Sequence, residues 1–379
     1  MITFNPDKFG YYEVDGRTTY SKLEAAEWAH LNKSKVRWNF NDEVFSKINW
    51  SEEPKESLWE LYKARARQIR AAYDYVVLWY SGGSDSHNML LAWIDAGLKI
   101  DEIATTWNYE TTGDPQNHYN AEISNVVLPD IKKLQDSGLE FKFRVIDMAE
   151  PSLKLFDVWG NNFEYNINCH FSPNNPARSM FREIVPDYKN IINEGKKLCF
   201  VWGKEKPFVN YESSIDRFYF HFLDNGDNCV SPYVQKRYYQ GWYDEFFYWS
   251  PDFPLIPVKQ AHVLINFMRY ASGSETVKSK SLEKHVHNNQ FNPGFNLKAV
   301  SLKDSVVKLL LYPKWSNDIF CNGKTSSFTY SLRDDWFFLG NLEQKKKFIE
   351  ITNTYYNRID PTDKKRITVS PMFSRKYFI

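Results

Sequence analysis

The residues best suited to chemistry in this chain stand together in one short string, SGGSDS at residues 81–86. Two adjacent glycines let the backbone fold closely around a bulky anion, because neither carries a Cβ. Serine hydroxyls at positions 81, 84 and 86 add hydrogen-bond donors. A helix that starts here adds the unpaired N–H groups of its first turn and the positive end of its dipole. The string therefore predicts a phosphate cradle.

Asp85 is the residue of this string that a bound polyanion would repel. Its carboxylate fits a phosphate site if it helps to hold Mg²⁺ or if it caps the loop. An ordinary SGGS turn with Asp85 as helix cap is the alternative interpretation of the whole string. The apolar run YVVLWY at residues 75–80 and the helical pattern after the string favour the phosphate site, because a strand, a glycine loop and a helix together build such a cradle.

The segments around the string alternate between strand and helix patterns. Short apolar runs predict buried parallel strands, and helical spacing of apolar residues predicts the helices between them. The predicted strands are 75–80, 102–107, 140–146 and 197–202, and the predicted helices are 54–72 (with Ser51 as N-cap), 86–96, 117–137 and 177–193. This order predicts an α/β fold, with a parallel sheet covered by helices on both faces and ligands beyond the carboxyl ends of the strands.

Basic residues near the strand ends are further candidates. Lys204 and Lys206 follow the fourth predicted strand, where their charge would neutralise phosphate or a transition state. A solvated turn is the alternative. Arg178 and Arg182 are four residues apart and share one face of a predicted helix. They are candidates for contact with an acidic substrate or phosphate, and a solvated helix face fits them equally well.

The string SGGSDS after VVLWY resembles the SGGxDS loop of the PP-loop, or N-type, ATP pyrophosphatase superfamily. Enzymes of that superfamily bind ATP in a HUP-type α/β domain. Most cleave ATP between the α and β phosphates and adenylate a carbonyl-type oxygen, which a nitrogen or sulfur nucleophile then displaces. The resemblance covers roughly residues 70–210. It implies a HUP-like ATP-binding domain, ATP and Mg²⁺ as cofactors, and an acceptor substrate that the sequence does not identify.

Two more strings resemble the phosphoadenylylsulfate reductase branch of that superfamily. NYETTGDP at residues 108–115 looks like a degenerate form of its DTGxxFPET stretch, and GKEKP at 203–207 stands where it carries a glycine and basic residues. The resemblance implies that ATP is bound by Ser81, Gly82, Gly83, Ser84, Asp85, Ser86, Thr105, Thr106, Trp107 and Gly203. The catalytic candidates are Asp85, Lys204 and Lys206, and the substrate candidates are Arg178, Arg182 and Asp114. Asp85 is also the candidate Mg²⁺ ligand.

The cysteines depart from that branch. Its reductases need a cysteine in a C-terminal ECGxH-type motif, whereas no cysteine follows Cys321 here. Cys169 stands beside His170, and Cys199 lies in a predicted strand, where we expect it in the core. The leading expectation is thus an adenylating enzyme. The alternatives are a nucleotide-binding or assembly protein that keeps the fold without the reaction, and a sulfonucleotide-binding reductase-like protein.

Charge and composition narrow the partners. Forty-eight Lys and Arg against 47 Asp and Glu leave a net charge of +1, which provides no bulk attraction to nucleic acid or to an anionic membrane. The aromatic stretch 233–253 contains Lys236 and Arg237, and it fits either stacking on nucleic-acid bases or packing in a core or an oligomer interface. The near-neutral charge of the chain favours packing in a core or an interface. No stretch approaches the roughly 20 apolar residues that span a bilayer. We expect a cytoplasmic protein.

The chain of 379 residues is long enough for more than one domain. We expect an N-terminal extension at 1–53, the ATP-binding α/β domain at 54–210, and a C-terminal α+β substrate or interaction region at 211–379. The alternation of strands and helices is expected to stop after Pro207.

Overall fold

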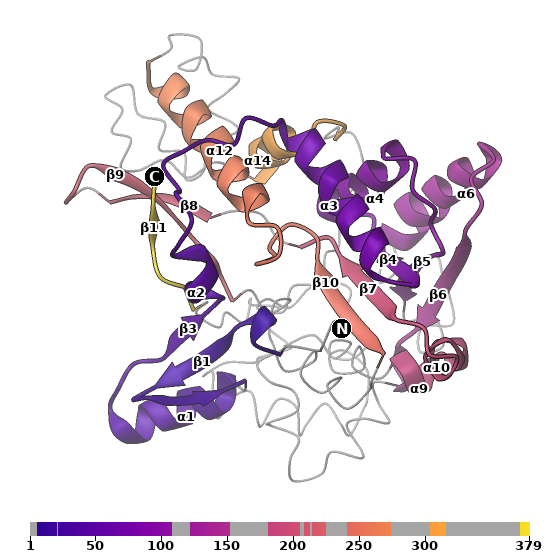
Figure 1. The fold of residues 1–379 in the computed structure, drawn as a ribbon, viewed down its shortest axis with the longest axis horizontal. Helices are drawn as coiled ribbons and strands as arrows, with labels where there is room; N and C mark the ends of the chain where they lie inside the picture. Colours follow the sequence, from indigo (N-terminus) through magenta and orange to yellow (C-terminus); the bar gives the residue numbers. More distant parts are fainter. Residues whose placement is uncertain are drawn as a thin grey trace, which may run out of the picture.

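A five-stranded parallel sheet, the central sheet, is the largest sheet that the computed structural model describes (Figure 1). The structure describes residues 6–20, 22–107, 122–151, 181–204, 208–212, 214–224, 241–273, 304–315 and 372–379. The strands of the sheet are β4 (Tyr75–Trp79), β5 (Glu102–Trp107), β6 (Lys142–Asp147), β7 (Leu198–Trp202) and β10 (Trp242–Phe246). Every neighbouring pair is parallel. The α/β fold and its first four strands are as predicted.

The order of the strands defines one special point in the sheet. Their spatial order is β10-β7-β4-β5-β6. Numbered from one to five along the chain and read from β6, this is the order 3-2-1-4-5. From β4 the chain adds β5 and β6 on one side and then β7 and β10 on the other. The strand order therefore reverses between β4 and β7. In open α/β sheets, ligands bind outside the carboxyl ends of the strands at such a point.

Helices cover both faces of this sheet. The helices nearest the sheet are α3 (Leu58–Ala72), α4 (Ser84–Asp95), α6 (Leu128–Asp136), α9 (Phe181–Ile184) and α10 (Pro186–Asn193), with the π-helical turn η3 (Ile123–Val127) before α6. On one face, the ring of Tyr188 from α10 meets the ring of Phe200 at 5.1 Å. Glu245 of β10 pairs with Val201, which follows Phe200 in β7. Because successive residues of a strand point to opposite faces, the Glu245 side chain lies on the other face of the sheet. There it bonds to Arg65 of α3 at 2.6 Å.

Two predicted helix starts are wrong. The helix expected from residue 54 begins at Leu58, because Ser57 caps it: the Ser57 hydroxyl accepts from Glu60 N, and the Glu60 carboxylate accepts from Ser57 N. This capping box satisfies two helix-end donors at once. The helix expected from Ser86 begins at Ser84. The second half of the SGGSDS string therefore forms the first turn of α4.

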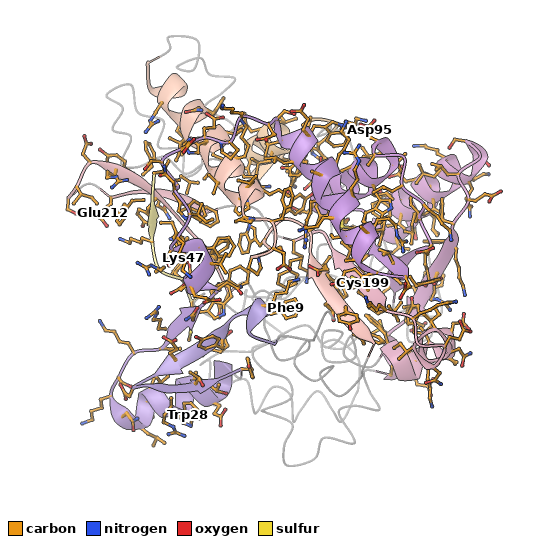
Figure 2. All side chains as sticks on the ribbon, in the orientation of Figure 1. Phe9, Trp28, Lys47, Asp95, Cys199 and Glu212 are labelled. Carbon is orange, nitrogen blue, oxygen red and sulfur yellow. The ribbon has the colours of Figure 1, made fainter. Side chains whose placement is uncertain are left out.

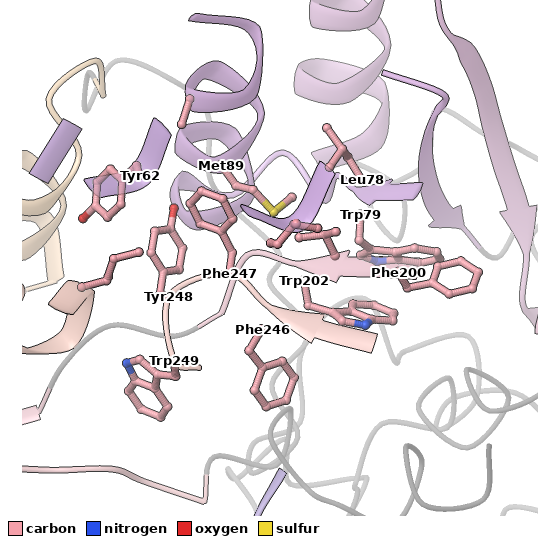
Figure 3. Packing of buried hydrophobic residues seen from close by; sticks show 14 of the residues in the cluster. Tyr62, Leu78, Trp79, Met89, Phe200, Trp202, Phe246, Phe247, Tyr248 and Trp249 are labelled. Carbon is pink, nitrogen blue, oxygen red and sulfur yellow. The ribbon is translucent and has the colours of Figure 1, made fainter. Parts of the chain in front are cut away.

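The central sheet gains one more strand after Pro207, because β10 joins β7 in parallel. The alternation of strands and helices stops there as expected within the described residues, since the strands Phe208–Glu212 and Arg217–His221 follow β7 with no described helix between them. The aromatic stretch that contains β10 belongs to the core where the structure describes it. Its buried aromatic members, each at most 2% exposed, are Trp242, Phe246, Phe247, Tyr248 and Trp249. Figure 3 shows the last four packed in the core. The core interpretation is confirmed for these residues, while Lys236 and Arg237 lie outside the described ranges.

Two smaller, three-stranded sheets accompany the central one. The first, of order β2-β1-β3, comprises β1 (Tyr11–Val14), β2 (Arg17–Thr19) and β3 (Arg37–Asn39), with η1 (Pro6–Phe9), α1 (Lys22–Asn32) and α2 (Asp42–Phe45). The second, of order β11-β9-β8, comprises β8 (Phe208–Glu212), β9 (Arg217–His221) and β11 (Tyr377–Phe378). Two helices, α12 (Leu255–Gly273) and α14 (Asp304–Leu311), pack on each other.

Buried polar contacts tie these parts together. Tyr12 donates to Asp224 at 2.8 Å, and Tyr377 donates to Asp42 at 3.0 Å. Lys8 Nζ lies 2.7 Å from the Glu245 carboxylate of the central sheet. Residues from the beginning, middle and end of the chain are thus joined across the molecule (Figure 1). No helix within the described ranges is long and apolar enough to cross a membrane.

Candidate functional site

The glycine loop leaves β4 and enters α4 at the point where the strand order reverses. Gly82 has φ +77°, which is in the left-handed region that favours glycine. A Cβ on Gly82 would lie 3.2 Å from side-chain atoms of Val126 and Val127 in η3. Gly83 is the N-cap of α4, with φ −78° and ψ 158° and no side chain to cap the helix. The positive end of α4 therefore opens onto the loop.

The Ser86 hydroxyl holds the shape of this loop. It donates to the carbonyl of Gly83 at 3.0 Å and accepts from Ser81 N at 3.2 Å. Its Oγ also lies 3.2 Å from Ser81 Oγ. Ser84 is fully buried, and its Oγ lies 3.5 Å from an oxygen of Asp85. The hydroxyls predicted as phosphate donors therefore already bond within the loop, and the Ser86 hydroxyl stabilises the loop conformation.

Two tyrosines from distant parts of the chain hold Asp85. Tyr312 donates its hydroxyl to Asp85 Oδ1, and Tyr248 donates to the Asp85 main-chain carbonyl at 2.7 Å. Burial raises the pKa of both phenols well above the ordinary value, so both stay protonated as donors. Asn88 donates in turn to the Tyr248 hydroxyl at 3.0 Å. One oxygen of the predicted Mg²⁺ ligand is therefore engaged by a phenol.

The described residues contain no group of three His, Cys, Asp or Glu side chains that could hold a metal ion. Asp85 would thus be one carboxylate ligand among ligands of another kind. Mg²⁺ usually keeps several waters and is held by one or two carboxylates together with substrate phosphates. The residues present fit an ion that arrives with a nucleotide rather than one that the protein holds alone.

The residue that follows β7 packs against the first turn of α4. A Cβ on Gly203 would lie 2.8 Å from Ser86 Cα and 2.9 Å from the Asp85 carbonyl oxygen. Only glycine lets β7 approach the first turn of α4 this closely. Lys204 follows at the same edge, with Nζ 5.3 Å from the centre of the Trp202 ring, within the range of a cation–π contact. Lys206 lies outside the described residues.

The end of β5 lies beside the loop on the other side of β4. Tyr80 N donates to the Ala104 carbonyl at 2.9 Å, which joins the two strands next to the loop. Thr105 is 1% exposed, whereas Thr106 and Trp107 are half-buried at the carboxyl end of β5. The structure therefore brings the loop, the end of β5 and Gly203 with Lys204 to one edge. Among the substrate candidates, Asp114, Arg178 and the side chain of Arg182 lie outside what the structure describes.

A cluster of three polar side chains beside the loop was missed by the sequence analysis. Tyr80 donates to Asp130 Oδ2 at 2.6 Å, and His87 Nδ1 lies 3.0 Å from the Tyr80 hydroxyl. Because the single Tyr80 proton goes to Asp130, a neutral His87 donates its Nδ1 proton to Tyr80 and keeps Nε2 as an acceptor. Burial lowers the pKa of His87, Asp130 partly offsets this, and Lys133 lowers it further. His87 follows SGGSDS directly, but no pattern in the sequence pairs it with Asp130.

Cys199 is in the core, as predicted. It is fully buried within β7 (Figure 2), and burial raises the pKa of its thiol well above the ordinary value. A thiol in this state is not a reactive thiolate. Cys169, Cys229 and Cys321 lie outside the described residues.

No protein-family model, no curated protein and no solved structure matches this chain.

Proposed function

We propose that this chain is an ATP-binding PP-loop enzyme with a HUP-like domain, which adenylates a substrate and releases pyrophosphate for transfer of nitrogen or sulfur. The single observation that carries the proposal is the position of the SGGSDS loop. It joins β4 to the positive end of α4, beside the point where the strand order reverses. Both features favour a bound polyphosphate.

Each candidate residue takes a distinct part in the proposed reaction. Backbone N–H groups at the start of α4 bind the β and γ phosphates, and the backbone of residues 105–107 holds the adenine. An oxygen of the acceptor bonds to the α phosphorus, and the bond from that phosphorus to the bridging oxygen breaks. Lys204, and Lys206 as the second candidate, offset the charge that develops on the departing pyrophosphate. Mg²⁺ carried by the nucleotide supplies further charge neutralisation, with Asp85 as its candidate protein ligand.

The test of this proposal compares ATP binding with ATP cleavage. Calorimetry with the full chain measures ATP affinity with and without Mg²⁺. The Gly83→Val variant is compared with the parent, because valine readily adopts the extended φ and ψ of Gly83 and we expect its side chain to block close approach of a phosphate to the loop. We expect the parent to bind ATP and the folded variant to lose binding. Equal affinity in both proteins would overturn the proposal.

Product analysis then separates the enzyme from the alternatives. With ATP, Mg²⁺ and a panel of carbonyl-containing acceptors, the enzyme should form AMP and pyrophosphate rather than ADP and phosphate. The Tyr312 hydroxyl on Asp85 favours the second candidate, a nucleotide-binding protein without the reaction, because that carboxylate already has a structural partner. ATP binding with no AMP across the panel would support it. Thioredoxin-dependent release of sulfite that disappears in Cys169→Ser would instead support the reductase-like alternative.

A further inference from the structure

A segment from far along the chain lies against the first turn of α4. This segment, residues 304–315, contains α14 and the turn after it. Tyr62 of α3 donates to the Leu311 carbonyl at 2.9 Å. Lys314 Nζ lies 3.1 Å from Asp95 at the other end of α4. The segment is therefore fixed along both α3 and α4.

Two aromatic side chains of the segment reach the residues beside the glycine loop. Tyr312 is fully buried and donates to the Asp85 carboxylate. The ring of Trp315 stands edge-on to the ring of His87, with centroids 5.8 Å apart. The backbone bond from Trp315 N to the Tyr312 carbonyl, at 2.9 Å, fixes the two side chains relative to each other. Residues more than 220 positions away in sequence thus contact the first turn of α4 at two points.

The contact with Asp85 has a consequence for an anion in the loop. Asp85 is the second residue of α4, so its charge lies close to any phosphate at the helix end. A carboxylate that can turn toward the loop opening would repel a polyphosphate. The hydrogen bond from Tyr312 holds one oxygen of Asp85, so the carboxylate cannot rotate freely. It also reduces the negative charge on that oxygen.

We propose that Tyr312 is a positioning residue of the nucleotide site, which orients Asp85 and couples the docking of residues 304–315 to occupancy of the loop. This inference rests on the proposed function. Coupling between two equilibria is reciprocal. Docking of the segment therefore raises the affinity for ATP, and ATP strengthens the docking of the segment by the same factor.

The first experiment measures ATP affinity by calorimetry in the full chain and two tyrosine variants. Tyr312→Phe keeps the buried ring and removes the hydroxyl on Asp85. Tyr75→Phe is the matched control, because its hydroxyl bonds to Glu102 at the end of β4 away from the loop, and not to Asp85 or to the segment. We expect Tyr312→Phe to weaken ATP binding about tenfold, and Tyr75→Phe to change it less than about twofold. Parent-like affinity in a folded Tyr312→Phe protein would overturn the inference.

A double variant tests whether Tyr312 acts through Asp85. On an Asp85→Asn background no carboxylate charge is left to orient, so adding Tyr312→Phe should change ATP affinity less than about twofold. A full tenfold loss on that background would show that Tyr312 acts by another route and would overturn the inference.

Hydrogen exchange on the parent protein provides a readout that does not depend on any variant folding. Saturating ATP should slow amide exchange in residues 305–315, and Tyr312→Phe should remove most of this slowing. Exchange in the segment that ATP leaves unchanged would overturn the coupling while leaving ATP binding intact. A parent protein that binds no ATP would instead overturn the proposed function and, with it, this inference.

Discussion

Gly82 meets two separate demands on a residue without a side chain. Its φ of +77° lies in the region where other L-residues are strained, and its missing Cβ leaves room for the two valines of η3. Gly203 meets a third demand, since backbone atoms of residues 85 and 86 lie under 3 Å from where its Cβ would be. The conformation of the loop therefore depends on the lack of a Cβ at these glycines as much as on its hydroxyl groups.

Gly82→Ala should destroy the anion site, and Gly138→Ala should not. Both residues have a positive φ, +77° and +86°, so alanine strains the backbone similarly in each, by about 1–2 kcal/mol. Only at Gly82 does the added carbon press on Val126 and Val127; at Gly138 it meets open space. Urea denaturation should show a loss of stability in both variants, larger in Gly82→Ala because of the valine contacts, while calorimetry should show ATP binding only in Gly138→Ala. Retained ATP binding in Gly82→Ala would argue against a tightly shaped loop.

Lys204 should matter for the chemical step. If it offsets charge on the departing pyrophosphate, Lys204→Ala should lose about 2–4 kcal/mol of transition-state stabilisation, measured as a fall in kcat/KM for AMP formation. Lys204→Arg should restore ATP binding more than turnover, because a planar guanidinium differs from a point charge. Lys99→Ala, at an exposed lysine beside the opposite end of β5, is the control. Equal kinetics for both alanine variants would place Lys204 on a solvated turn.

At the scale of elements, the strands that could be predicted are those whose burial is readable from their own residues. β4 and β7 are short apolar runs, YVVLW and LCFVW. β10, WYDEF, was missed because it contains Asp244 and Glu245, which are nevertheless buried. Asp244 accepts from the indole N–H of Trp202 at 2.7 Å, and Arg65 and Lys8 bond to Glu245. These partners lie elsewhere in the chain, so a local pattern cannot reveal them.

The candidate site divides in the same way. The loop could be predicted from its own six residues, and its place at the strand ends from the alternation around it. The partners of its side chains could not be predicted, because Tyr248 and Tyr312 approach Asp85 from positions 163 and 227 residues further along the chain. The helix start at Ser84 rather than Ser86 was missed because Gly83 provides no side-chain cap to mark it.

Arg65 should be essential for keeping β10 in the sheet. The Arg65 and Glu245 side chains are 2% and 5% exposed. Burial raises the pKa of Glu245, but the charges of Lys8 and then Arg65 outweigh it and lower this pKa to about 2. Arg65→Met removes one partner of a buried charge, which should cost about 3–5 kcal/mol of unfolding free energy. Lys142→Met, which breaks a half-exposed pair with Asp187, should cost less than about 1 kcal/mol. Chemical denaturation of both variants makes the comparison, and equal small losses would show that Glu245 does not depend on Arg65.

At the scale of the whole molecule, the three sheets are joined by buried contacts between segments that are distant in sequence. Tyr12 and Met372 both donate to the buried Asp224, from opposite ends of the chain. His221 of β9 is also buried, and burial lowers its pKa to about 4, with Lys376 acting in the same direction. Protonation of such groups affects the folded state as a unit, so the pH dependence of unfolding is a property of the whole chain.

Acid should begin to destabilise the protein at pH values above those at which its carboxylates become protonated. Between pH 6.5 and about 4, His221 binds a proton in the unfolded chain but not in the folded one, so stability falls as pH falls through this range. A difference of about 2.5 pH units corresponds to a loss of about 3 kcal/mol at most, and His87, whose pKa is also lowered, acts in the same direction. Glu245 stabilises the fold above its unfolded pKa, near 4.5, and this contribution is lost only as pH falls toward 2. Unfolding free energy measured from pH 7.5 to 4.5 should therefore decline in the parent, decline less in His221→Gln, and be unaffected by His30→Gln, a control at the exposed end of α1. An equal slope in the parent and in His221→Gln would show that this histidine does not set the acid limit of the fold.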